Sequence, residues 1–105
     1  MFKAMILLTR RSDLSHEAFV QWWLDEHRPR ALGLPNLRRL VFNVVDASPA
    51  EGSVDAIAEL WFDTQAAFEA ACATELGEAL AADSLAHVSG RLRLFVTETP
   101  PVPGG

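Results

Sequence analysis

The sequence has little of what would place it in several common functional classes. Its single cysteine, Cys72, cannot form an internal disulfide, which suits a reducing compartment, and we expect a cytoplasmic protein. Nine lysines and arginines against 14 aspartates and glutamates give a net charge of -5. This balance argues against nucleic acid as a partner, because neutralising phosphates requires clustered basic side chains. No apolar run approaches the roughly 20 residues that cross a bilayer, so no membrane segment is predicted.

The sequence also lacks the spacing that is typical of metal ligands. The three histidines, at positions 16, 27 and 87, show no ligand spacing such as HxH or HExxH, and no metal site is expected. Hydrophobic residues make up 50% of the 105-residue chain, which is enough for one thin core that a partner subunit would help to stabilise. We predict one domain over residues 1–99 and a flexible tail rich in proline and glycine over residues 100–105.

Apolar and turn-forming residues alternate along the chain in the order strand, helix, strand, strand, helix, strand. The strands are expected over residues 2–9, 38–46, 54–62 and 91–98. One helix is predicted from Ser15 to Arg28, ending before Pro29, and a second starts at Thr64, with a break and a short helix around 73–83. This order predicts an α+β, ferredoxin-like βαββαβ fold whose four-stranded antiparallel sheet carries both helices on one face.

The other face of the predicted sheet is not cleanly polar. In the third strand, Ile57 and Trp61 alternate onto the same side as Asp55 and Glu59. An antiparallel sheet covered on one side normally shows a polar outer face. We therefore expect this face to pack against a second copy, giving a homodimer. A solvent-exposed face with a few stray apolar residues is the alternative.

The first helix contains the stretch FVQWWLDEH, residues 19–27. Phe19, Trp23 and His27 recur every four residues and share one side of the helix. They form either the inner stripe of a core helix or the wall of a small-molecule cavity with an ionisable group at its end. An imidazole exchanges protons near neutral pH, and a helix C-terminus would favour its protonated form. The alternative is a structural histidine that caps the last turn and packs on Trp23.

Arginine and asparagine side chains are the next candidates for binding a substrate. A carboxylate or lactone would need guanidinium donors, which Arg30, beside His27, and Arg39, at the start of the second strand, can supply. Strand alternation lets only one of Arg38 and Arg39 face a cavity. Asn43 has the same parity as Arg39 and would present an amide to the same space. Solvation at the surface is the alternative for each of these side chains.

The other two histidines and the cysteine are not expected to take part in catalysis. His16, in the first helical turn, is expected to be exposed. His87 precedes the last strand and lies either at the surface, which is favoured, or at the mouth of the cavity. Cys72 is expected to be a small buried hydrophobic residue rather than a reactive thiol.

Four phrases carry a resemblance to a known family. They are LSHEAF with the tryptophan pair and histidine that follow it, GLPNLRRLVFN, VDAIAELWF and GRLRLFVTE, in this order. Together they span about residues 2 to 98 and resemble the EthD-like family of dimeric α+β barrels, most closely its muconolactone methylisomerase type. The resemblance implies an enzyme without a cofactor that isomerises or cyclises a small lactone or aromatic-derived substrate in a cavity between sheet and helices.

The same resemblance implies roles for individual residues. His27 matches the catalytic helix histidine of the methylisomerase type, and we expect Phe19, Trp23 and Leu60 to contact the substrate. Leu60 stands where that type has a functional cysteine, and a leucine cannot ionise, so a mechanism that requires both groups does not transfer. The alternative is a non-catalytic accessory or ligand-binding protein. Haem bound by His27 is a third hypothesis, because some other dimeric α+β barrels bind haem.

Overall fold

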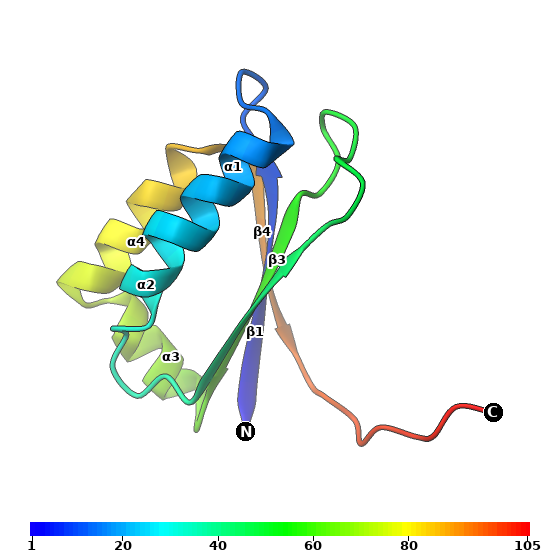
Figure 1. Ribbon diagram of the computed structural model, residues 1–105. Helices are drawn as coiled ribbons and strands as arrows, with labels where there is room; N and C mark the ends of the chain where they lie inside the picture. The colour runs from blue at the N-terminus through cyan, green and yellow to red at the C-terminus, as the bar shows by residue number, and fades with distance from the viewer.

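The computed structural model describes all residues from 1 to 105 and contains one antiparallel sheet with its helices on one face (Figure 1). The strands are β1 (Phe2–Arg10), β2 (Arg39–Val44), β3 (Ala56–Phe62) and β4 (Val88–Val96), in the order β2-β3-β1-β4. The helical elements are α1 (His16–Trp22), η1 (Trp23–His27), α2 (Arg28–Ala31), α3 (Gln65–Cys72) and α4 (Glu75–Leu85). The predicted ferredoxin-like α+β fold is confirmed, with strand ends shifted by a few residues.

The strand register decides which side chains face the helices. Ala4 and Ile6 of β1 lie on the helix side, and so do the residues directly opposite them on β3 and β4, because paired residues share a face. The same rule places the alternate residues of all four strands on the outer face. Apolar members of that face are Met5, Leu7, Val41, Ile57, Trp61, Leu92, Leu94 and Val96. The outer face is therefore mixed, because these apolar residues lie beside Lys3, Arg39, Asn43 and Glu59.

The first helical run is longer than the sequence predicts. It begins as expected at Ser15, whose hydroxyl accepts a hydrogen bond from the Ala18 amide at 3.0 Å. It then passes through Pro29 and ends at Ala31, so the prediction that Pro29 ends the helix is wrong. The reason is η1, a π-turn that precedes the proline. A proline within a helix lacks an N–H and clashes with the preceding turn. The π-turn has a wider hydrogen-bond spacing than an α-helix, which leaves room for the ring.

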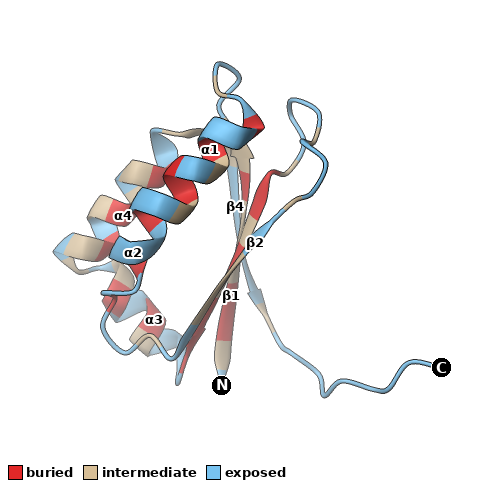
Figure 2. Ribbon diagram, in the orientation of Figure 1, coloured by how far each residue is buried: buried red, intermediate tan, exposed pale blue.

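The core lies between the sheet and the helices, and buried residues concentrate on the facing sides of both layers (Figure 2). Both adjacent tryptophans are buried. Trp23 stacks on Phe42 of β2 with ring centroids 4.0 Å apart, whereas Trp22 stacks on His87 at 3.8 Å. The two rings therefore join the first helical run to opposite edges of the structure.

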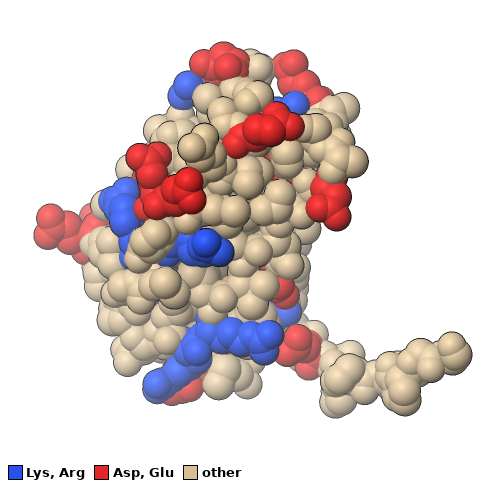
Figure 3. Space-filling view, in the orientation of Figure 1, with Lys and Arg blue, Asp and Glu red and all other residues tan.

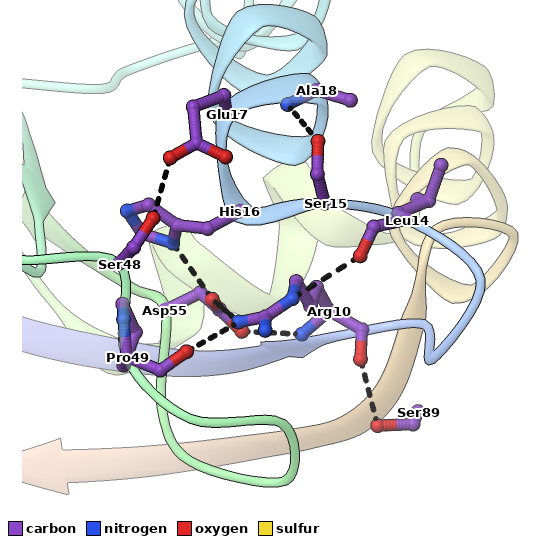
Figure 4. A network of polar contacts seen from close by, with 10 residues as sticks. All are labelled: Arg10, Leu14, Ser15, His16, Glu17, Ala18, Ser48, Pro49, Asp55 and Ser89. Atoms are coloured by element: carbon purple, nitrogen blue, oxygen red, sulfur yellow. Dashed lines mark hydrogen bonds and ion pairs between the residues drawn. The ribbon is translucent and has the colours of Figure 1, made fainter.

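A buried polar network ties the start of α1 to the end of β1 and the β2–β3 loop (Figure 4). Asp55 is fully buried and accepts hydrogen bonds from the Arg10 amide at 2.8 Å, from the Arg10 guanidinium and from His16 Nδ1 at 2.7 Å. Arg10 also donates to the Pro49 carbonyl at 3.0 Å. The prediction that His16 is exposed is wrong, because this carboxylate draws the ring inward until only 8% of the residue is exposed.

The remaining surface is uneven in charge. In the view of Figure 3, acidic side chains dominate the upper part, near the β1–α1 and β2–β3 loops, and basic side chains gather in the middle and lower part. After Val96 the chain forms no helix or strand and leads away from the body (Figure 1). None of the helices combines the length and hydrophobicity that crossing a bilayer requires.

Gly77 provides a test of the packing between α3 and α4. A Cβ at this position would lie 2.6 Å from the Cys72 carbonyl oxygen and closer still to that of Ala71, and neither backbone atom can rotate away. We expect Gly77→Ala to lower the free energy of unfolding by about 2 kcal/mol, measured by urea denaturation. Gly90→Ala is the control, because its Cβ would meet Thr9 at an ordinary 3.6 Å. Equal stability of the two variants would contradict this packing.

Asp55 should be a main support of the fold. We expect Asp55→Ala to lower the free energy of unfolding by about 3 kcal/mol, because Arg10 and His16 would lose their buried acceptor. Burial alone would raise the pKa of Asp55, but the hydrogen bonds from Arg10 and His16 outweigh it and hold the pKa below 3.8. Its stabilisation is therefore present above about pH 4 and lost as the pH falls through the lower folded pKa.

Urea denaturation near neutral pH and an acid titration followed by circular dichroism would measure both effects. Asp25→Ala is the matched control, because Asp25 is exposed and forms no ion pair. A variant Asp55→Ala with the stability and acid transition of the unmodified protein would show that the network does not support the fold.

Candidate functional site

A cavity of about 260 Å³ lies between the sheet and the helices. It is lined by 19 residues, of which 13 are hydrophobic. All four strands contribute to its floor, and η1, α2, α3 and α4 contribute to its roof. Its polar or ionisable side chains are His27, Cys72, Glu78, Ser84, Arg91 and Arg93. This volume lies near the lower end of the range for ligand pockets, roughly 300–1,000 Å³, and suits a small molecule.

His27 is presented to the cavity by the π-turn, a local structure that occurs often at functional sites. The residue is buried, and its Nδ1 lies 2.9 Å from Asp83 Oδ2 on α4. Because a carboxylate only accepts hydrogen bonds, this contact assigns the proton to Nδ1. The lone pair of the neutral ring is then on Nε2, which lies 3.4 Å from the hydroxyl of Ser84.

The surroundings keep His27 neutral. Burial lowers the pKa of His27 below its ordinary 6.5, the hydrogen bond and charge of Asp83 offset part of this, and Arg30 and His87 lower the pKa further. The expectation that a helix C-terminus favours the cation is wrong. The helical run continues to Ala31 after His27, so the ring lies within the run and not at its end. A neutral, oriented imidazole is suited to accept a proton.

The contact of His27 with Asp83 and that with Ser84 form a chain like the one that activates a serine as a nucleophile. Ser84, however, is a residue of α4, where amides are bonded within the helix and cannot stabilise an oxyanion. The geometry therefore supports proton transfer by His27 and not covalent catalysis by Ser84. In the absence of another partner, the Ser84 hydroxyl can donate to Nε2 and hold the ring in place.

Three of the predicted site residues meet at this cavity. His27, Trp23 and Leu60 all line it. Phe19 is fully buried and packs against Trp22, with ring centroids 5.4 Å apart, so it belongs to the core and does not line the cavity. Arg30 does not line it either. Its exposed guanidinium lies 3.4 Å from Asp83 and so contacts the partner of His27.

Arg39 and Asn43 do not lie where we predicted them. They are on the outer face of the sheet, where Arg39 lies over the ring of Trp61 at 4.7 Å and Asn43 donates to Glu59 at 2.9 Å. The reason is the alternation of β2, which turns Leu40 and Phe42 toward the helices. Periodicity pairs Arg39 with Asn43, but it does not tell which face is inside.

The structure also brings residues to the site that the sequence analysis did not select. Arg91 and Arg93 line the cavity from β4, and their shared parity in GRLRLF was the available signal. Asp83 had no such signal, because its partnership with His27 spans 56 positions of the chain. Cys72 lines the cavity as well. Burial raises its pKa above the ordinary 9.0, which keeps the thiol protonated and unreactive near neutral pH.

The lining residues do not fit a haem group or a metal ion. No group of three or more histidine, cysteine, aspartate or glutamate side chains is placed to hold a metal. Nδ1 of His27 is bonded to Asp83, which leaves one ring nitrogen for any ligand of the cavity. Haem is a macrocycle much larger than the small molecules that a cavity of about 260 Å³ suits.

Solved structures share this fold over nearly the whole chain. An ethyl tert-butyl ether D (EthD) family protein from Bacillus halodurans superposes with a TM-score of 0.77 at 21% identity, covering 94% of this chain and 100% of that one. A dimeric ferredoxin-like protein of unknown function from Thermobifida fusca superposes with a TM-score of 0.73 at 15% identity, covering 92% of this chain and 90% of that one. An antibiotic biosynthesis monooxygenase superposes with a TM-score of 0.71 at 16% identity, covering 95% of this chain and 100% of that one. These similarities show a common fold, which alone does not carry an activity.

The sequence itself was also compared with known proteins. No protein of curated function matches it. A family model described as the EthD domain matches residues 11–89, which include the first helical run, β2, β3 and both later helices. Since this match spans most of the chain and the fold agrees with that of an EthD family protein, the chain belongs to the EthD family.

Proposed function

We propose that this EthD-family protein is a small enzyme, independent of cofactors, that isomerises or cyclises a small lactone or aromatic-derived substrate. The observation that carries the proposal is the neutral imidazole of His27, oriented by Asp83 at the wall of an apolar cavity. The resemblance to the muconolactone methylisomerase type supports the substrate class. The reaction type follows from the chemistry available to one oriented base.

His27 acts through Nε2 in this mechanism. The nitrogen removes a proton from a carbon next to a carbonyl group, and Asp83 stabilises the imidazolium that forms. The same nitrogen then returns the proton to a different carbon, so substrate and product have equal mass. Because Leu60 replaces the cysteine of the methylisomerase type, we assign both proton transfers to His27. The apolar walls keep water from competing for the intermediate.

A second candidate is an accessory or ligand-binding protein without catalysis. In that case the cavity and the rings of Trp23 and Phe42 only hold a ligand, and the pair of His27 and Asp83 is structural. Leu60 favours this candidate, because it removes one of the two ionisable groups of the methylisomerase type. Turnover is the property that separates the two candidates.

The outer face of the sheet supports the proposed homodimer. Leu92 and Leu94 are 54% and 40% exposed there, although both are large apolar residues on a regular strand. Lys3 lies on the same face, paired with Glu59 at 2.7 Å and placed over the ring of Trp61. Its charge is thus already paired on the face that we propose a second copy covers. The dimeric ferredoxin-like protein from Thermobifida fusca supports the same assembly.

Substitution of His27 and Asp83 tests catalysis. We expect His27→Gln to lower kcat/KM by about a hundredfold or more, because the base is lost. Asp83→Asn should cause a similar loss, because an amide cannot stabilise the imidazolium and can force the proton onto Nε2. The assay is mass spectrometry of small lactones, muconate-like acids and polyketide-like phenols, with a product of unchanged mass as the signal. Since the pKa of His27 is lowered, activity should fall only as the pH drops below 6.5.

Glu26→Gln is the matched control, because Glu26 lies in the same π-turn, is exposed and contacts neither His27 nor the cavity. Thermal melting with each compound shows whether binding is retained. If compounds raise the melting temperature equally in the unmodified protein and in His27→Gln, and none is converted, the ligand-binding candidate replaces the enzyme.

The proposed dimer predicts the effect of a charge on the outer face. We expect the unmodified protein to have the mass of two chains in light scattering, and Leu94→Arg to have the mass of one, because the new charge would be buried. Leu85→Arg is the control, because Leu85 is 62% exposed on the helical side of the molecule. A monomeric unmodified protein, or a dimeric Leu94→Arg variant, would contradict this interface.

A further inference from the structure

Arg91 and Arg93 are the cationic groups of the cavity, and neither has an acidic partner. They pair with Leu8 and Ile6 of β1 and therefore share the side of β4 that faces the helices. Five of the nine basic side chains form ion pairs, and these are Lys3, Arg10, Arg11, Arg30 and Arg38. The two cavity arginines are not among them. Two neighbouring positive charges thus stand at an apolar cavity without compensation.

We propose that Arg91 and Arg93 bind a carboxylate group of the ligand and so set the substrate class as small, flat organic acids. The proposal rests on the proposed function only in that the cavity holds a small molecule, and it applies equally to an enzyme and to a binding protein. A guanidinium offers a planar fork of donors that matches the two oxygens of a carboxylate. Two such forks from one strand can address the same anionic group from adjacent positions.

The proposed anion site and the proposed base reach the cavity from different elements, β4 and η1. His27 is beside Phe42 of β2, with ring centroids 6.3 Å apart, whereas Arg91 and Arg93 belong to β4. Three strand spacings separate β2 from β4, which is roughly 14 Å at about 4.8 Å each. A ligand held by the arginines would therefore extend its uncharged part across the aliphatic floor toward His27.

The positive charges on β4 favour an anionic ligand. Desolvation by the surrounding protein and the charge of Arg93 lower the pKa of Arg91 below its ordinary 12.5, although both arginines are partly exposed to solvent. Glu78 is the only acidic residue that lines the cavity, and it pairs with neither arginine. A bound carboxylate would relieve the repulsion between the two guanidinium groups. The chain carries a net charge of -5, so this local positive charge is unlike the protein as a whole.

Aromatic rings help to hold one of the arginines in place. The guanidinium carbon of Arg93 lies 5.3 Å from the ring centroid of Phe68 and 5.4 Å from that of Phe95. Contacts of this kind restrict the side chain without using its hydrogen-bond donors. The donors of Arg93 thus stay available to a ligand, and Phe68, which also lines the cavity, offers its ring to the flat part of the same molecule.

The test compares 2-naphthoate with its neutral amide, 2-naphthamide, by calorimetry near neutral pH. We expect the carboxylate to bind the unmodified protein about tenfold or more tightly than the amide, as for hydrogen bonds to charged groups. Arg91→Gln and Arg93→Gln should each remove most of this preference, and the double variant all of it. The preference should also shrink between about 50 mM and about 500 mM salt. Arg28→Gln is the matched control, because Arg28 is exposed, forms no ion pair and loses the same charge.

Equal binding of the two probes, retention of the preference in Arg91→Gln and Arg93→Gln, or failure of both probes to bind at millimolar concentration would each overturn the proposal. Melting temperatures of the arginine variants show that the fold is kept. His27→Gln separates this proposal from the proposed enzyme activity. A carboxylate preference that persists in His27→Gln supports the anion site whether or not the unmodified protein turns over any substrate.

Discussion

Because the helices of both strand–helix–strand units pack on the same face of the antiparallel sheet, one layer of helices covers the main hydrophobic core. Fourteen buried hydrophobic residues form that single core, and the cavity is the space that its large rings leave between the layers. The other face has no helix to cover it and still carries Leu92, Leu94 and Trp61. The internal cavity and the proposed dimer surface are therefore two consequences of the same one-sided arrangement.

Two pairs of aspartate and histidine occur in this small chain, and their surroundings give them different properties. Asp55 and His16 are enclosed and do not line the cavity, and Asp55 also accepts hydrogen bonds from Arg10. The hydrogen bonds of this pair therefore only hold β1, α1 and the β2–β3 loop together (Figure 4). Asp83 and His27 also join two elements, but His27 lines a cavity. A pairing of residue types thus becomes a candidate for chemistry only where space for a ligand lies beside it.

Much of the fold could be predicted from the sequence, and less of the site. Alternating and helical periodicities are local, so the strands and the inward stripe with Trp23 and His27 were visible in the sequence. Arg39 was placed in the cavity and Arg91 was not selected, because alternation groups residues by face without naming the inner face. The helix was predicted to stop at Pro29, because the π-turn that accommodates the proline has no sequence signal that we used.

The sequence by itself determined the order of the elements, the one-domain fold, the resemblance to the EthD-like family and the candidacy of His27. Only the tertiary structure decided the partner of that histidine, its neutral state and the group of side chains that shares its cavity. The physical reason is the range of the interactions. Hydrophobic periodicity acts between residues a few positions apart, whereas desolvation and the hydrogen bond to Asp83 arise only when α4 is packed against η1, 56 positions along the chain.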